Sequence, residues 1–410
     1  MGRFMVPSAR QPESVFRSSE FRRYYAGQAL SYLGDGLRTL VIPLLVFHLT
    51  GSAVSLGLTF AFELLPFALF SLLGGSLADR LDRRKLMLGS DAVRFVIMAL
   101  FTVALWRGVL SLPLLYTGVV LLSICAAIFL GAQASSIPFL LGKDRAKAAV
   151  AALVATEQGV NLIAPPLGGA IFGLVGAVPA LAINAATYLT SQVSIASVAS
   201  FGPERPGGFP PLSVIAADIA AGFRFVIGDR TMRILTFSST AINATAIFGF
   251  VAMIPFLKHL GANDQTVGIA FGCFSLGSLG GSLVAGRTHW PFGRALAIAY
   301  VVDALFWLPI IWTHSLVVAV GLVSLCAACG AYEITSIVAW RMRVIPADMI
   351  GRVFGVIRLL VLVGMVPASI LGGVIADRWG TRAVMGLSGG LFLLLALNLM
   401  SSRVVLSERR

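Results

Sequence analysis

Five ionisable side chains interrupt long apolar stretches of this 410-residue chain: Asp35, Arg38, Glu63, Glu333 and Arg358. An ionisable group in an apolar surrounding is costly, so each of these residues is a candidate functional site. Desolvation disfavours the charged form of a carboxyl group and a neighbouring arginine favours it, so such a carboxyl group can bind and release a proton. These residues therefore indicate proton binding or recognition of a charged substrate group.

Asp35 and Arg38 lie about one helical turn apart, and Asp35 is roughly 16 Å into a helix that begins near Tyr24. The two residues either take part in proton coupling or form a structural pair in which each neutralises the other. Glu63 precedes Pro66, so it is either a proton site or a cap for a kinked helix. The residues alone leave these alternatives open.

The composition is that of a membrane protein with many spans. Hydrophobic residues make up 58% of the chain and charged residues 12%, against about 25% charged residues in soluble domains. Apolar stretches of about 20 residues predict an all-α integral membrane protein with twelve transmembrane helices. Their approximate limits are 24–48, 52–78, 86–106, 111–133, 149–173, 177–199, 232–257, 265–286, 293–313, 315–340, 350–375 and 382–402.

One long connection divides the chain into two halves. Residues 201–230 open with GPERPGGFPP, in which Pro and Gly break any helix. They continue with an amphipathic stretch, 212–227, which we expect on the membrane surface. We therefore predict an N-terminal six-helix bundle over 1–200, a cytoplasmic linker with an amphipathic helix over 201–230, and a C-terminal six-helix bundle over 231–410.

The basic residues orient the predicted spans. The chain has 31 Lys and Arg against 18 Asp and Glu, a formal net charge of +13. With the N-terminus in the cytoplasm, 24 of the 31 basic residues fall in cytoplasmic turns, linker or tails, three within spans and four outside. This bias predicts that both termini are cytoplasmic. It also directs the positive charge toward anionic lipid head groups rather than toward nucleic acid.

An internal repeat supports the two-bundle prediction. Leu-Gly-Gly begins at Leu73, Leu167, Leu279 and Leu371; the first and third copies are 206 residues apart and the second and fourth 204. In the predicted topology, two copies lie near cytoplasmic helix ends and two near outer ends. This is the pattern of two pseudo-symmetric halves that each contain two inverted three-helix units. The glycines allow helices to approach closely.

The turn after the second predicted span carries six charges in seven residues (DRLDRRK, 79–85). Its spacing from Gly75 resembles the signature loop between helices 2 and 3 of the major facilitator superfamily of secondary transporters. Together with the twelve spans and the repeat, this resemblance covers the whole chain. It is consistent with a cytoplasmic latch, in which charged groups pair with neighbouring helix ends. The latch residues that we expect are Gly75, Asp79, Arg80, Arg83, Arg84 and Glu157.

The fifth predicted span carries the sequence APPLGG (164–169). Through Pro165, Gly168 and Gly169 it resembles the Gly-Pro-x-x-Gly-Gly element of drug/proton antiporters, which is associated with export, although Ala164 replaces the usual glycine. The structural alternative is a Pro-kinked helix packed closely on span 8. The segments FRRYYAGQALSYLGDGL and RVIPADMIGRVFGVIR resemble the branch that contains the enterobactin exporter and the macrolide efflux proteins. Span 4 lacks the arginine that many proton-coupled antiporters have there.

The resemblance also implies that spans 1, 4, 7 and 10 line a central cavity. Asp35 and Arg38 are then expected to face this cavity, with Glu333 as a second carboxylate. Arg358 is expected to pair with a carboxylate across the cavity or to attract an anionic substrate. Three further charged residues within spans are interpreted as partners of the basic turns: Asp91, Arg94 and Asp303.

We therefore expect a monomeric secondary transporter in a bacterial cell membrane, driven by the proton gradient and without a cofactor. Its expected substrate is an amphipathic small molecule, namely a drug, macrolide or siderophore, exported by alternating access. The alternative is a lipid or lysolipid transporter of the same fold, and a third hypothesis is a membrane sensor or enzyme. The chain has no Walker loop, metal-ligand pair or nucleophile-elbow pattern.

Overall fold

The computed structural model describes residues 14–78, 80–199, 201–202, 212–288, 291–346 and 349–401. Within these residues the regular secondary structure is entirely helical. The elements are η1 (Val15–Arg17), α1 (Ser19–Thr50), α2 (Ala53–Ala78), α3 (Arg83–Trp106), α4 (Leu112–Leu141), α5 (Lys143–Val175), α6 (Ala177–Ala196), α7 (Leu212–Gly228), α8 (Arg230–Val251), α9 (Met253–His259), α10 (Asp264–Arg287), α11 (Phe292–Trp307), η2 (Leu308–Ile311), α12 (Leu316–Val344), α13 (Ile350–Trp379) and α14 (Thr381–Ser401).

Eleven helical segments of the described chain are long and apolar enough to cross a membrane, counting α8 with α9 as one. The twelfth span is α6, which packs along α1 and α3. Polar side chains on one face of α6, namely Asn184, Thr187, Tyr188 and Ser191, set it apart from the other spans. The all-α fold with twelve spans is thus confirmed.

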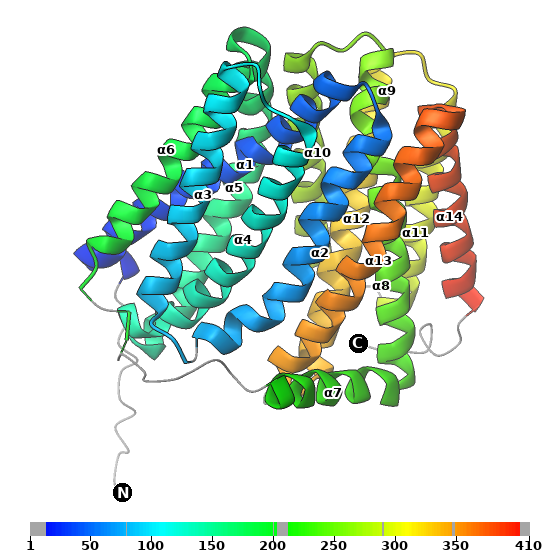
Figure 1. Ribbon diagram of the computed structural model, residues 1–410. Coiled ribbons are helices and arrows are strands. Elements are labelled where there is room, and N and C mark those ends of the chain that lie inside the picture. Colours follow the sequence, from blue (N-terminus) through cyan, green and yellow to red (C-terminus); the bar gives the residue numbers. More distant parts are fainter. Residues whose placement is uncertain are drawn as a thin grey trace, which may run out of the picture.

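The spans form two bundles that stand side by side, α1–α6 and α8–α14 (Figure 1). Helix α7 lies across one end of the second bundle and packs against α13. The first residue of α1 and the last residue of α14 are at this same end. We call it the α7 end, and the other end, where α1 turns into α2, the opposite end.

Close helix crossings occur where the Leu-Gly-Gly repeats fall. A Cβ atom on Gly74 of α2 would lie 2.5 Å from the backbone oxygen of Ala127 in α4, and one on Gly281 of α10 would overlap Ala328 of α12. The repeat in α13 faces two helices at once, because Gly372 meets Phe248 of α8 and Gly373 meets Ala53 of α2. Glycine is required at these crossings because any side chain would push the backbones apart.

The seventh span is broken, whereas the sequence predicts it as continuous over 232–257. Helix α8 ends at Val251 and α9 begins at Met253. Pro255 has no N–H to donate to the carbonyl of Val251, so the α-helical hydrogen bond there is lost. The short helix α9 consequently belongs to the opposite end, where it contacts α1.

Two helix pairs form the main contacts between the bundles: α2 with α13, and α5 with α10. Ser369 Oγ donates a 3.1 Å hydrogen bond to the carbonyl of Gly57 across the first pair. Gly169 and Gly268 meet backbone to backbone across the second. All four residues lie in the half of their helices nearer the opposite end, so the bundles are joined most tightly there.

Candidate functional site

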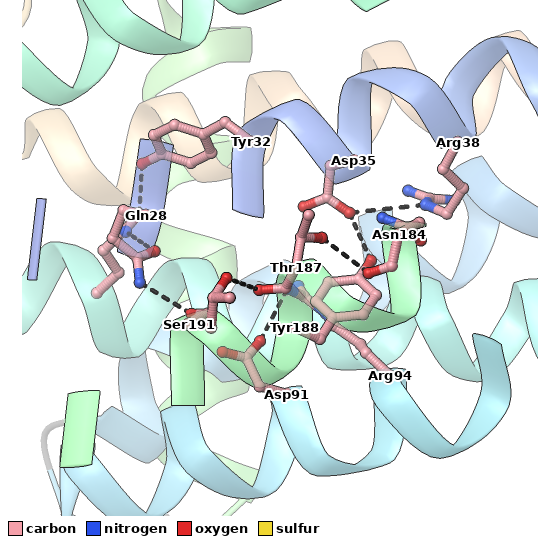
Figure 2. A network of polar contacts seen from close by, with 12 residues as sticks. Gln28, Tyr32, Asp35, Arg38, Asp91, Arg94, Asn184, Thr187, Tyr188 and Ser191 are labelled. Atoms are coloured by element: carbon pink, nitrogen blue, oxygen red, sulfur yellow. Dashed lines mark hydrogen bonds and ion pairs between the residues drawn. The ribbon is translucent and has the colours of Figure 1, made fainter. Parts of the chain in front are cut away.

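Arg38 links two carboxylates from different helices. Its Nε atom lies 3.6 Å from Asp35 Oδ1 on α1, and its Nη1 atom donates a 3.2 Å hydrogen bond to Glu63 Oε1 on α2. The Arg38 side chain is 12% exposed. Tyr188 on α6 donates a 2.5 Å hydrogen bond to the same Asp35 oxygen. Asp35, Arg38 and Glu63 are therefore brought together, and Asp35 accepts a hydrogen bond from Tyr188 and pairs with Arg38 (Figure 2).

The close approach of α1 and α6 makes this arrangement possible. A Cβ atom on Gly34 would lie 2.6 Å from Asn184 Nδ2 and closer still to Thr187. Because Gly34 has no side chain, the polar face of α6 can reach Asp35, the next residue of α1. The spacing of polar residues on α6, at positions i, i+3, i+4 and i+7, is the signal that would have revealed this contribution from the sequence.

Asp91 and Arg94 belong to the same polar interior, and their interpretation as partners of the basic turn is wrong. Arg94 Nη1 donates a 3.4 Å hydrogen bond to Asp91 Oδ1, and both side chains are buried. The Arg94 guanidinium also lies 4.9 Å from the ring centre of Phe129 and 5.5 Å from that of Tyr188. Burial between α3, α4 and α6 keeps this pair away from the turn at the α7 end.

Uncharged polar groups extend the network toward the α7 end. Gln133 of α4 donates from Nε2 to Tyr24 Oη and to Gln28 Oε1, each at 3.0 Å. Gln28 donates in turn to Ser191 Oγ at 3.0 Å, and Tyr32 donates to Gln133 Oε1 at 3.3 Å. A chain of hydrogen bonds therefore runs along the inside of α1 from Tyr24 through Gln133 and Gln28 to Ser191, one turn of α6 from Tyr188 (Figure 2).

The charges of this N-terminal network do not balance. It holds three carboxylates, Asp35, Glu63 and Asp91, and two guanidinium groups, Arg38 and Arg94. If every group is ionised, one negative charge remains. Such an excess in a half-buried site favours the uptake of one proton or of one cationic group.

The C-terminal bundle presents a cavity of about 660 Å³ toward the α7 end. Its walls come from the last turns of α12, the first turns of α13, the first half of α8 and the end of α2. Glu333 and Arg358 line it, as does Arg341, which the sequence analysis did not single out because it lies beyond the predicted limit of span 10. Arg341 Nη2 donates to the carbonyl of Leu235 and to Ser239 Oγ.

Glu333 is buried without a partner. Its side chain is 1% exposed, and neither carboxylate oxygen has a hydrogen-bond partner in the described structure. A buried, unpaired carboxylate carries a large desolvation cost, which is removed when the group binds a proton or a cation. Glu333 therefore is a group of the cavity wall that would be stabilised by binding a proton or a cation.

Asp303 lies behind this cavity and does not contact a basic turn, so its interpretation from the sequence is wrong. It is 2% exposed, it interacts with Cys326 and Trp307, and its Oδ1 atom has no hydrogen-bond partner among the described residues. It lines a smaller cavity of about 160 Å³ with the aromatic rings of Phe250, Phe274, Trp307 and Phe392. The two cavities share the walls Ile242, Asn243 and Ile334.

Arg358 and Glu157 lie on opposite bundles. The Arg358 guanidinium lies 4.6 Å from the ring centre of Phe67 on α2. Glu157 is on α5, more than three turns from the helix start at Lys143, and Asp35 and Arg358 are close enough to act on it electrostatically. Because Asp79 lies outside the described residues, the assignment of Glu157 to the latch stays a prediction.

The described residues of the basic turn bind within their own bundle. Arg83 donates to the carbonyl of Phe201 at 3.3 Å and covers the ring of Phe139, and Arg84 donates to the carbonyl of Ala196. Arg80 lies in the turn, and Gly75 has open space where a Cβ would be. Asp79 lies outside the described residues, so the latch stays a prediction.

The APPLGG segment of α5 lies in the contact with α10. Pro166 packs on Gly272, and a Cβ atom on Gly169 would lie 2.5 Å from Gly268 Cα. The carbonyl of Pro165 lies against Gly268, and Gly168 faces Leu37 of α1. This segment thus seals the bundles near the opposite end, as a Pro-containing helix with small residues can.

Two carboxylates that the sequence analysis did not select complete the seal. Asp377 at the end of α13 accepts hydrogen bonds from Ser52 Oγ at 2.6 Å, Ala53 N at 2.7 Å and Val54 N at 3.1 Å. Asp264 at the start of α10 lies 3.5 Å from His48 Nε2 and 2.5 Å from Lys258 Nζ. Asp377 follows Leu371 by six residues, as Asp79 follows Leu73, so the repeat contained the signal for it.

The two bundles are joined at the opposite end, and the cavity lies toward the α7 end. The sequence of this chain matches a known family of transporters. Residues 11–409 match the family described as transmembrane secretion effector, which is nearly the whole chain. The chain belongs to this family of the major facilitator superfamily. It is therefore a multi-pass membrane transporter, and its relatives place it in a bacterial cell membrane.

Curated relatives of this transporter are efflux proteins. It is 25% identical over 398 residues to the multidrug efflux pump Tap of Mycobacterium tuberculosis, covering 91% of this chain and 89% of the pump. It is 22% identical over 379 residues to the enterobactin exporter EntS of Citrobacter koseri, covering 86% and 84%. It is 23% identical over 394 residues to macrolide efflux protein A of Streptococcus pyogenes, covering 92% and 94%. The resemblance to this branch, inferred from the sequence, is confirmed.

A solved structure supports the same fold. The crystal structure of a D-xylose-proton symporter superposes with a TM-score of 0.76 at 15% identity, over 95% of this chain and all of that chain. At this identity the likeness concerns the fold alone. The arrangement of twelve helices in two bundles is therefore shared with a transporter whose sequence has diverged widely.

Proposed function

We propose that this transporter exports amphipathic small molecules of the drug, macrolide or siderophore class, in exchange for protons, by alternating access. The observation that carries the proposal is the 660 Å³ cavity at the α7 end, which has apolar walls and three ionisable side chains, Glu333, Arg341 and Arg358. Such a lining suits a substrate with a large apolar body and a few polar groups. The efflux relatives support export as the direction.

The distribution of basic residues supports a cytoplasmic position for the α7 end. The present conformation then faces inward, with the cavity open to the cytoplasm and the outer end sealed by the pairs α2–α13 and α5–α10. Export requires the reverse change, in which these contacts separate and the cytoplasmic ends of the bundles approach. At Gly169 and Gly57 the contacts that must separate are between backbones, with no side chain of the glycine between the helices.

Two features support proton coupling. The N-terminal network has one more carboxylate than guanidinium groups, and Glu333 is buried without a partner. Each site is stabilised by one proton in the closed surroundings and can release it when water enters. In this exchange, a proton binds from outside when the outward-facing cavity is empty. The proton leaves to the cytoplasm from the inward-facing state, before the substrate binds there.

The test uses inverted membrane vesicles with an acidic interior. Addition of a transported compound is expected to dissipate the pH gradient in wild type, and the panel should contain lipophilic cations, macrolides, catecholate siderophores and lysolipids. We expect Asp35→Asn and Glu333→Gln to reduce this response at least about tenfold, because each removes a titrating group. Asp218→Asn is the matched control, since Asp218 is an exposed carboxylate of α7 that does not line the cavity and forms a 2.9 Å surface ion pair with Arg352.

A response that survives both carboxylate substitutions would overturn the assignment of Asp35 and Glu333 to coupling. Substrate accumulation without any proton movement would overturn proton exchange itself. A response only to lysolipids would favour the lipid transporter in place of the drug exporter.

A further inference from the structure

A second large cavity lies in the outer wall of the C-terminal bundle, apart from the site described above. It is a groove of about 600 Å³ bounded by α10 and α11, with α12 as its floor. Its lining is small and apolar, and includes Gly280, Val284, Ile298, Val302 and Ala328. Val284 and Ile298 are 58% and 48% exposed. In a membrane-spanning bundle, such exposed apolar side chains face lipid rather than water.

Two adjacent glycines of α10 create the groove. Gly281 packs directly on the backbone of Ala328, which holds α10 against α12. Gly280, by contrast, has no heavy atom of the described chain within 4 Å of the position that its Cβ would occupy. Gly280 therefore leaves an open space on the surface of α10. The close contact of Gly281 with α12 places that space next to the floor of the groove.

The groove has a cationic mouth. Arg287 and Thr288 line it at the end of α10, and Arg287 is exposed. Among the described residues, no carboxylate forms an ion pair with Arg287. Seven residues separate Gly280 from Arg287, so the mouth lies about 10 Å along the helix from the apolar interior. The groove therefore has a polar end near the membrane surface, and its apolar part runs from there toward the middle of the membrane.

We propose that this groove binds one anionic glycerophospholipid from the adjoining leaflet, with an acyl chain along Gly280 and Val284 and its phosphate on Arg287. A guanidinium group binds a phosphate with two parallel hydrogen bonds, and the apolar slot accepts only a chain without polar groups. Arg287 and the α7 end share the leaflet that the basic residues assign to the cytoplasm, where anionic lipids attract cations. The proposal does not depend on the substrate or coupling ion proposed above.

The site is placed where it can affect transport. Tyr332 on the floor of the groove precedes Glu333, which faces the transport cavity from the other side of α12. A bound lipid therefore rests on the helix that carries the buried carboxylate.

The experiment measures lipid retention by native mass spectrometry. Wild type and variants are reconstituted in vesicles of phosphatidylglycerol and phosphatidylethanolamine, extracted in detergent, and examined for bound lipid. We expect one phosphatidylglycerol on wild type and none on Gly280→Leu, whose side chain fills the slot. Gly286→Leu is the matched control, because Gly286 lies on the same helix, also has open space, and does not line the groove.

The mouth is tested in the same way. We expect Arg287→Gln to lower phosphatidylglycerol retention about fivefold, since one cationic residue near a lipid surface contributes about 1 kcal/mol. Arg294→Gln, an exposed arginine on the first turn of α11 outside the groove, should retain wild-type occupancy. Thermal unfolding in lipid-free detergent verifies that the variants are folded.

Equal retention by wild type, Gly280→Leu and Gly286→Leu would overturn the site. A different result is that Gly280→Leu loses bound lipid, Arg287→Gln does not, and both lipids bind wild type equally. This result would overturn recognition of an anionic headgroup and leave a slot for any acyl chain.

Discussion

Asp377 of α13 caps the N-terminus of α2 in the other bundle, accepting a 2.7 Å hydrogen bond from the backbone amide of Ala53. It also accepts bonds from Val54 N and Ser52 Oγ. A helix N-terminus carries unpaired N–H groups and a partial positive charge, so a carboxylate stabilises it. Here the cap comes from the opposite bundle, and separation of the bundles must break it.

Asp377→Ala should therefore favour opening of the end opposite α7. Loss of a helix cap costs about 0.5–2 kcal/mol, which corresponds to a population shift of roughly twofold to thirtyfold. Spin labels on Thr50 and Trp379, which end α1 and α13, would report a larger share of long distances. Ser52→Ala is the control, because it removes one hydrogen bond and keeps the carboxylate. An unchanged distance distribution in Asp377→Ala would contradict a role for this cap in closure.

His48 and Asp264 join the two bundles at the same end. His48 Nε2 on α1 lies 3.5 Å from Asp264 Oδ2 at the start of α10. Lys258 Nζ lies 2.5 Å from the other Asp264 oxygen, and the Phe172 ring lies 5.1 Å from the imidazole and covers it.

His48→Leu should therefore weaken closure of this end, because it removes the contact with Asp264. The same spin-label pair would then report a larger share of long distances. The effect of Asp377→Ala should be unchanged in this variant, since the two contacts share no residue. An unchanged distance distribution in His48→Leu would contradict a role for this contact in closure.

Glu157 and Arg358 should depend on each other in transport. They carry opposite charges on opposite bundles and lie close enough to attract each other electrostatically. Glu157→Arg and Arg358→Glu each place like charges opposite one another, and we expect each to reduce transport more than tenfold. The double variant restores the attraction and should recover most of the rate. Additive losses in the double variant would show that the two residues act independently.

Arg94 should contribute mainly to stability. Its removal in Arg94→Met leaves Asp91 as an uncompensated buried charge, which typically costs 3–5 kcal/mol. The double variant Asp91→Asn/Arg94→Met removes both charges and should be markedly more stable than Arg94→Met alone. Thermal unfolding in detergent measures both. If Arg94→Met were as stable as wild type, the pair would have no structural role.

The sequence by itself determined the spans, the two halves and the places of close helix contact. Twelve apolar stretches must become helices because backbone polar groups in lipid have to bond within the segment. The Leu-Gly-Gly repeats and the APPLGG segment mark crossings because only small residues permit them. At least one glycine of each repeat, such as Gly74 or Gly281, is found at an interhelical contact for this reason.

The tertiary structure alone decided which charges are partners. Asp35 is held by Tyr188, Glu63 by Arg38, and Asp91 by Arg94 rather than by the basic turn. The order of residues along the chain does not reveal these choices, because they depend on which faces of distant helices meet and on how deeply each group is buried. For the same reason the unsatisfied oxygens of Asp303 and Glu333, in helices of similar apolar character, became apparent only from the packing of the described C-terminal helices.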